Sequence, residues 1–176
     1  MIDFSRNHFD LFGLAPSFRV DGAVLDHAYR QLQTDVHPDR FAGGSDAQKR
    51  IAQQASARVN EAYRALKNPV QRAQYLLQLH GVDALSETDT ALPLAFLERQ
   101  LERREQAADA QAAGDVRKLS SLLADARAES AALEDVLARM LDSEQAYATA
   151  RMRVRELTFL SKLAEDVDAM LAAIEA

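Results

Sequence analysis

The second half of the chain has no proline after Pro93, and its apolar residues recur every three or four positions as far as the C-terminus. This spacing places them on one face of an α-helix. Breaks are predicted at Gly114, with Asp115 as the cap of the following helix, and near Ser143. We therefore predict three long helices packed as an antiparallel bundle. Because no stretch of the 176 residues alternates like a strand, the predicted fold class is all-α.

Two amphipathic segments of the first half flank the tripeptide His37, Pro38 and Asp39. Proline disfavours helix for the residue before it, so the segment at residues 25–36 is predicted to end at His37. The segment at residues 47–67 follows, with Ser45 or Asp46 as its cap. Their apolar faces predict an antiparallel helical hairpin whose bend carries the tripeptide on a surface loop. The predicted inward face of the second segment consists of Ile51, Ala55, Val59, Ala62 and Leu66.

Shorter signals complete the predicted organisation. Residues 8–14 read as a short helix that ends at Gly13, with Phe9 and Phe12 covering the hairpin. Asn68 and Pro69 predict the start of another short helix, over residues 70–79. The polar stretch that follows reads as a linker. We predict three parts: a first domain at 1–80, a linker at 81–91 and the helical bundle at 92–176.

Composition narrows the function classes. The absence of cysteine excludes disulfides and thiolate metal sites, and it fits a reducing compartment. The N-terminus has no signal-peptide pattern, and no apolar run is long enough to span a bilayer, so we expect a cytoplasmic protein without membrane contact. Net charge is +2 over residues 1–80 and −8 over residues 81–176. This acidic second half argues against nucleic acid as a partner.

Signals for catalysis are missing from the sequence. It contains no glycine-rich phosphate loop, and its four histidines have no metal-ligand spacing. His37 and Asp39 are too few for a metal site, which needs three or four ligands. Acidic and basic residues alternate along the second half as they do on solvated helix faces. We therefore expect no catalytic site, metal or cofactor.

The first half resembles the J-domain, the module that stimulates ATP hydrolysis by DnaK-class chaperones. The resemblance implies that His37, Pro38 and Asp39 contact the chaperone, with Arg30 and Arg40 supplying positive charge nearby. The basic face that usually precedes the loop is sparse here, because Arg30 has Asp26 and Asp35 as neighbours. The matching stretches are Asp10-Leu11-Phe12-Gly13-Leu14, Tyr29-Arg30-Gln31-Leu32, His37-Pro38-Asp39-Arg40-Phe41 and Asn60-Glu61-Ala62-Tyr63.

Three further stretches carry a resemblance to a known family: Arg72-Ala73-Gln74-Tyr75-Leu76-Leu77, Phe96-Leu97-Glu98-Arg99-Gln100-Leu101-Glu102-Arg103-Arg104-Glu105 and Val154-Arg155-Glu156-Leu157-Thr158-Phe159-Leu160-Ser161-Lys162-Leu163. Through them the second half resembles the C-terminal bundle of HscB-type co-chaperones. The resemblance implies a co-chaperone of iron–sulfur cluster assembly that binds an IscU-type scaffold and presents it to an HscA-type chaperone. The resemblance also implies that the chain itself holds no iron–sulfur cluster. The implied scaffold contacts are Leu97, Leu101, Glu102, Arg104, Glu105 and Phe159.

Periodicity supports these scaffold contacts unequally. Phe159 lies off the stripe formed by Leu157, Leu160 and Leu163, so it is expected to be partly exposed. Leu97 and Leu101 share a spacing with Leu94 that fits bundle core equally well; only the resemblance favours an exposed patch. Glu98 stands where the family usually has an apolar residue, which implies a smaller, more polar client surface.

Two alternatives stay open. The chain can be a J-domain adaptor for a different client, which would share the first half and differ in what the bundle holds. It can also be a structural protein that associates with itself through its apolar stripes, since heptad-like spacing permits this. Under the favoured reading we expect a monomer.

Overall fold

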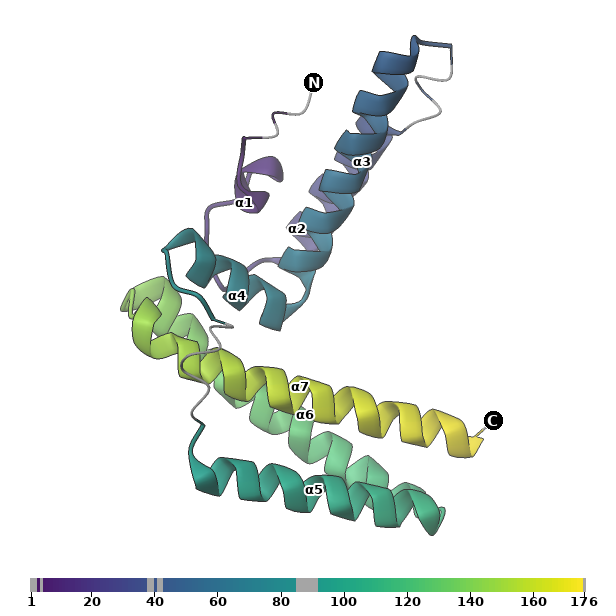
Figure 1. Ribbon diagram of the computed structural model, residues 1–176, viewed down its shortest axis with the longest axis vertical. Helices are drawn as coiled ribbons and strands as arrows, with labels where there is room; N and C mark the ends of the chain where they lie inside the picture. Colours follow the sequence, from purple (N-terminus) through teal and green to yellow (C-terminus); the bar gives the residue numbers. More distant parts are fainter. Residues whose placement is uncertain (1–2, 4, 38–39, 41–42, 85–91, 176) are drawn as a thin grey trace. The chain divides into compact units, whose positions relative to one another are not determined.

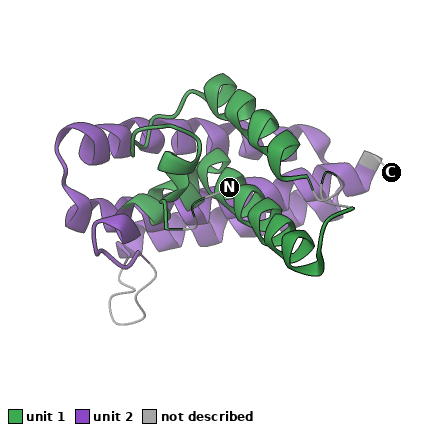
Figure 2. Ribbon diagram, turned by 90° about the horizontal axis from the view of Figure 1, so that it is seen from above, with its two compact units in different colours: residues 1–76 green, residues 77–176 purple. Residues whose placement is uncertain are grey.

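The computed structural model describes residues 3, 5–37, 40, 43–84 and 92–175. Within these residues there are helices and no strands, which confirms the all-α fold class. The chain divides into two compact units, residues 1–76 and 77–176 (Figure 2). The division falls inside a helix that spans residues 69–79. The domain bounds predicted from the sequence, with a linker at 81–91, stay a prediction.

The first unit is built around a helical hairpin. Its two long helices, α2 (Gly22–Val36) and α3 (Asp46–Lys67), lie side by side, with the short α1 (His8–Leu11) against α3 (Figure 1). Asp21 caps α2 by accepting hydrogen bonds from two backbone amides, and Ser45 caps α3 in a reciprocal capping box. A fourth helix, α4 (Pro69–Leu79), starts at the predicted Asn68–Pro69 signal.

Polar contacts fix the register of the hairpin. The rings of Tyr29 and Tyr63 stack with centroids 3.9 Å apart. The Tyr29 hydroxyl donates to Oδ1 of Asn60 at 2.9 Å, and the Tyr63 hydroxyl donates to Asp26 at 3.0 Å. Lys67 Nζ pairs with the same Asp26 carboxylate at 2.6 Å. Because each contact joins α2 to α3, a slip of one helix along the other would break all of them together.

The prediction that Ile51 of α3 lies in the core is wrong. Ile51 is 41% exposed, whereas its neighbour Ala52 is buried. Ala52 lies three residues before Ala55, so the inward stripe starts one position later than predicted and then continues as expected through Val59, Ala62 and Leu66. The stripe is rich in alanine, which lets α3 approach its neighbours closely.

The second unit is the predicted three-helix bundle. It consists of α5 (Leu94–Ala112), α6 (Val116–Ala138) and α7 (Tyr147–Glu175), which lie alongside one another (Figure 1). The turn from α5 to α6 uses Gly114 at φ +65° and the side chain of Asp115 as cap. A five-residue π-helix, η2 (Arg139–Ser143), forms the break predicted near Ser143. The large side chains buried in this unit include Leu119, Leu137, Val154, Leu157, Leu160 and Leu163.

A buried histidine gives the first unit a pH-dependent stability. His8 lies under the ring of Tyr75, with centroids 4.0 Å apart, and its Nδ1 has no hydrogen-bond partner among the described residues. Burial, reinforced by the Arg58 cation, lowers the pKa of His8 below its ordinary value. Below about pH 6.5 the unfolded chain therefore takes up a proton that the folded chain resists. The stabilisation is complete above this pH and is lost as the pH falls through the lowered pKa.

We therefore expect the melting temperature of the first unit to fall between pH 7 and pH 5, and His8→Phe to flatten that fall while keeping the ring contact. Thermal unfolding followed by circular dichroism at pH 7, 6 and 5 measures the melting temperature of each variant. His27→Gln, which changes an exposed histidine of α2, is the matched control and should keep the wild-type slope. Equal slopes for wild type and His8→Phe would contradict the assignment.

Candidate partner-binding sites

The first candidate site lies where α2 ends. His37 is the C-cap residue of α2, with an extended backbone (φ −58°, ψ 128°) and an exposed side chain. It borders a cavity of about 360 Å³ together with Gln33, Thr34 and Arg40. The helix thus ends at His37 as the following proline predicts, and the structure brings His37 and Arg40 together. Pro38 and Asp39 lie outside the described residues.

The acidic neighbours of Arg30 are engaged elsewhere. Asp35 forms an ion pair with Arg40 at 3.1 Å, on the exposed surface. Asp26 accepts hydrogen bonds from Lys67 and Tyr63, and the Lys67 hydrogen bond is the main cause of its lowered pKa. Neither carboxylate forms an ion pair with Arg30 among the residues that the structure describes. The Arg30 charge contributes to the lowered pKa of Asp26 without an ion pair, and Arg30 does not line the His37 cavity.

The second candidate site lies on α5, and the structure decides between core and patch. Leu97 is 37% exposed and Leu101 61% exposed, and Glu102, Arg104 and Glu105 are exposed as well. The face of α5 that packs into the bundle is formed by other residues. The buried ones among them are Phe96, Gln100, Ala107 and Ala110. Five of the six predicted scaffold residues therefore share the solvent-facing side of one helix.

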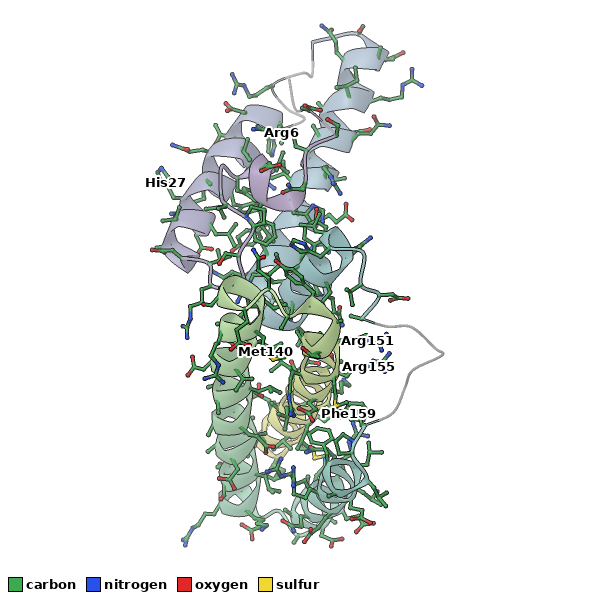
Figure 3. The ribbon with its side chains drawn as sticks, turned by 90° about the vertical axis from the view of Figure 1, so that its left-hand side faces the viewer. Arg6, His27, Met140, Arg151, Arg155 and Phe159 are labelled. Carbon is green, nitrogen blue, oxygen red and sulfur yellow. The ribbon has the colours of Figure 1, made fainter. Side chains whose placement is uncertain are left out.

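The sixth residue, Phe159, is brought to this helix by α7. Its ring meets the buried ring of Phe96 edge-on, at a centroid distance of 6.2 Å and an angle of 87°. Figure 3 shows Phe159 on the part of α7 that approaches α5. The side chain is partly exposed, as predicted, whereas Leu157, Leu160 and Leu163 are buried. Phe159 is thus packed against α5 through Phe96, the residue that precedes Leu97.

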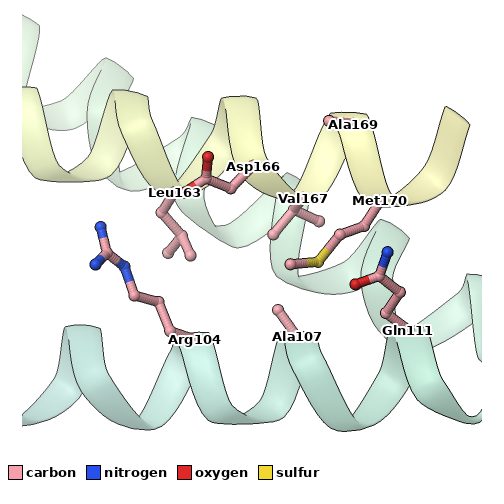
Figure 4. A pocket seen from close by; sticks show the side chains of 8 residues that line it. All are labelled: Arg104, Ala107, Gln111, Leu163, Asp166, Val167, Ala169 and Met170. Atoms are coloured by element: carbon pink, nitrogen blue, oxygen red, sulfur yellow. The ribbon is translucent and has the colours of Figure 1, made fainter. Parts of the chain in front are cut away.

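Sequence reasoning missed two features of this region. A cavity of about 430 Å³ opens between α5 and α7, with Arg104 near one end and Gln111 near the other (Figure 4). Gln100 is buried, and neither atom of its amide group has a hydrogen-bond partner among the described residues. The heptad spacing of Phe96, Arg103, Ala107 and Ala110 around Gln100 was the available signal for its burial.

Comparisons with known proteins cover both units. The family model described as DnaJ domain matches residues 7–75, and the one described as HSCB C-terminal oligomerisation domain matches residues 92–168. The co-chaperone protein HscB homolog of Burkholderia vietnamiensis is 49% identical over 175 residues, which is 99% of each chain. The chain belongs to the HscB co-chaperone family.

Solved HscB structures share the whole fold. Chaperone HscB from Vibrio cholerae aligns with a TM-score of 0.85 at 32% identity, covering 96% of this chain and 99% of that one. Human co-chaperone protein HscB aligns with a TM-score of 0.87 at 30% identity, covering 96% and 83%. HscB membership confirms the predicted function class, a J-domain co-chaperone of iron–sulfur cluster assembly. Which residues bind which partner is still a prediction.

The described residues contain neither a metal-binding cluster nor a membrane-spanning helix. No group of three or more histidine, aspartate or glutamate side chains within them is arranged to hold a metal ion. No described helix has the length and apolar character needed to cross a membrane.

Proposed function

We propose that this HscB-family chain is an adaptor with two binding ends. The C-terminal bundle binds an IscU-type iron–sulfur scaffold, and the His-Pro-Asp loop docks on an HscA-type chaperone and stimulates its ATPase. In this proposal the chain has no catalytic site or cofactor of its own and acts in the cytoplasm as a monomer. The J-domain comprises residues 1–80, the linker residues 81–91 and the scaffold-binding domain residues 92–176.

The chaperone end rests on the placement of His37. An imidazole at the end of α2, on a surface cavity shared with Arg40, is accessible to a protein partner. We assign a hydrogen bond to His37, the fixed loop geometry to Pro38 and a charge-assisted contact to Asp39. Arg30 and Arg40 provide positive charge that favours approach to an acidic surface of the chaperone.

The scaffold end rests on a single observation, the exposure of Leu97 and Leu101 on the outward side of α5. Exposed leucines in register on one helix form an apolar patch of the kind that marks a protein interface. We expect Phe159 to border this patch, because its ring packs against Phe96 of the same helix. Glu102, Glu105 and Arg104 surround the patch with charge. Charged residues at the rim of an apolar centre favour a partner with complementary charges.

Isothermal titration of the full-length chain with an IscU-type scaffold tests the scaffold end. Leu101→Ala is expected to weaken binding about tenfold, because it removes an apolar contact near the centre of the patch. Asp39→Asn should bind the scaffold as tightly as wild type, because it alters the other end. Equal scaffold affinity for Leu101→Ala and wild type would contradict the assignment of the patch.

The alternative of self-association has one observation in its favour, the words "oligomerisation domain" in the description of the matched family model. Light scattering over a hundredfold range of protein concentration distinguishes the two. We expect the mass of one 19.5 kDa chain throughout. A mass that rises with concentration, and a loss of that rise in Leu101→Ala, would assign the patch to a second copy of the chain instead.

A further inference from the structure

The apolar patch of α5 begins earlier than the six predicted residues. Leu94, the first residue of α5, is 71% exposed, more than any other large apolar side chain described. It precedes Leu101 by seven residues, or about two helical turns, so the two side chains lie almost on one line along the helix. Leu97 lies between them along the axis and slightly to one side. The three leucines form one continuous stripe.

The placement of this stripe is the opposite of what the burial of apolar side chains alone would favour. On the inward face of α5, Gln100 is buried and its amide group has no hydrogen-bond partner within the described part of the chain, while three leucines face solvent on the outward side. Burying a polar group without hydrogen bonds costs free energy, and an exposed leucine forgoes the gain from burial. Violations of the local pattern of this kind concentrate at functional sites. The arrangement indicates that the outward face of α5 is covered in a complex.

Carboxylates accompany the stripe along its whole length. Glu98 lies four residues after Leu94 and three before Leu101, and Glu102, Glu105 and Asp109 continue the row toward the end of α5. All four are exposed. None of them forms an ion pair among the residues that the structure describes. The surface that covers the leucines therefore meets a line of negative charge at its edge.

We infer that Leu94 is a further contact of the scaffold-binding surface, which extends by about one helical turn toward the start of α5, and that Glu98, already expected on that surface, makes a charged contact there. Leu94 inserts into an apolar part of the scaffold, and Glu98 faces a lysine or arginine at the edge of that part. This inference rests on the proposed function. Its basis is the continuity of Leu94 with Leu97 and Leu101, together with the charge complementarity that the acidic row requires.

Titration calorimetry of the full-length variants with an IscU-type scaffold tests the inference. Leu94→Ala is expected to weaken binding at least about fivefold, as for a residue that adds to a binding hot spot. Ile174→Ala removes an exposed apolar side chain from the far end of α7 and should bind like wild type. Neither substitution should change the melting temperature, because both side chains are exposed.

The salt dependence of scaffold affinity tests the contribution of the Glu98 charge. Glu98→Gln is expected to weaken binding about two- to fivefold at low salt and to converge with wild type as salt increases. Asp125→Asn, at an exposed carboxylate of α6, is the matched control and should have no effect. Equal binding of Glu98→Gln and wild type at low salt would remove Glu98 from the contact.

Leu101→Ala separates failure of the inference from failure of the proposed function. If Leu101→Ala weakens binding while Leu94→Ala does not, the surface stops at Leu97 and the inference is wrong. If neither substitution weakens binding, the scaffold binds elsewhere and both proposals are wrong. Weakening by both, with Ile174→Ala unchanged, supports both.

Discussion

Asp39→Asn is expected to remove most of the stimulation that this chain gives to the ATPase of its chaperone. The substitution keeps the shape of the side chain but removes its charge, and a charge-assisted hydrogen bond contributes about 1.5–3 kcal/mol. The loss corresponds to roughly 10- to 150-fold weaker docking. In a titration of chaperone ATPase against co-chaperone, the half-maximal concentration should rise by this factor.

A neighbouring carboxylate provides the control for Asp39→Asn. Asp46 is the first residue of α3, on the far side of the same loop, and it is exposed. Asp46→Asn removes one negative charge there and should leave stimulation close to wild type. If the two variants behave alike, the effect comes from overall charge and not from the His-Pro-Asp contact. Circular dichroism should show unchanged helix content for both.

Adjacent residues of α7 are expected to separate stability from binding. Leu160 is fully buried, and truncating such a side chain to alanine costs about 2–5 kcal/mol. For a unit of this size, Leu160→Ala should lower the melting temperature by roughly 10 °C or more. Phe159 is partly exposed, and its main described ring contact is the edge of Phe96. Phe159→Ala should therefore cost about 0.5–1.5 kcal/mol for the ring pair, in addition to its partial burial. It should still destabilise the unit less than Leu160→Ala, but weaken scaffold binding about tenfold or more.

The two variants must be measured by both methods. Calorimetric scanning gives the melting temperatures, and titration with the scaffold well below the lower melting temperature gives the affinities. Leu160→Ala is expected to bind the scaffold normally under those conditions. A loss of stability in Phe159→Ala as large as that in Leu160→Ala would place Phe159 in the core and remove it from the interface.

Local signals predicted where the helices begin and end. Ser45 and Asp115 cap helices as expected, because their side-chain oxygens accept hydrogen bonds from free backbone amides. Gly13 and Gly114 mark the ends of helices, since both adopt the left-handed backbone that favours glycine. The first helix is nevertheless shorter than predicted, ending at Leu11. These signals act over a few residues, so they can be read without knowing the tertiary structure.

Which face of a helix points inward was harder to predict. Ile51 lies four residues before Ala55, and this spacing predicts it in the core, yet the hairpin buries Ala52. On α5 the choice was open, since Leu94, Leu97 and Leu101 form a stripe at least as apolar as the one that contains Gln100. Packing against α6 and α7 decides it, and that depends on residues far away in the sequence. The leucines of the candidate patch could therefore be predicted only through the family resemblance, whereas periodicity alone predicts the partial exposure of Phe159.

Steady-state ATP hydrolysis by an HscA-type chaperone is the most direct test of whether the chain is an adaptor with two binding ends. The chain and an IscU-type scaffold are added to the chaperone separately and then together. We expect the ATPase rate to rise with the chain alone and to rise by more than the sum of the separate effects with both proteins, because the adaptor presents the scaffold to the chaperone. Stimulation by the chain with no further increase from the scaffold would contradict the scaffold-binding end. No stimulation at all would contradict the assignment of the His-Pro-Asp loop.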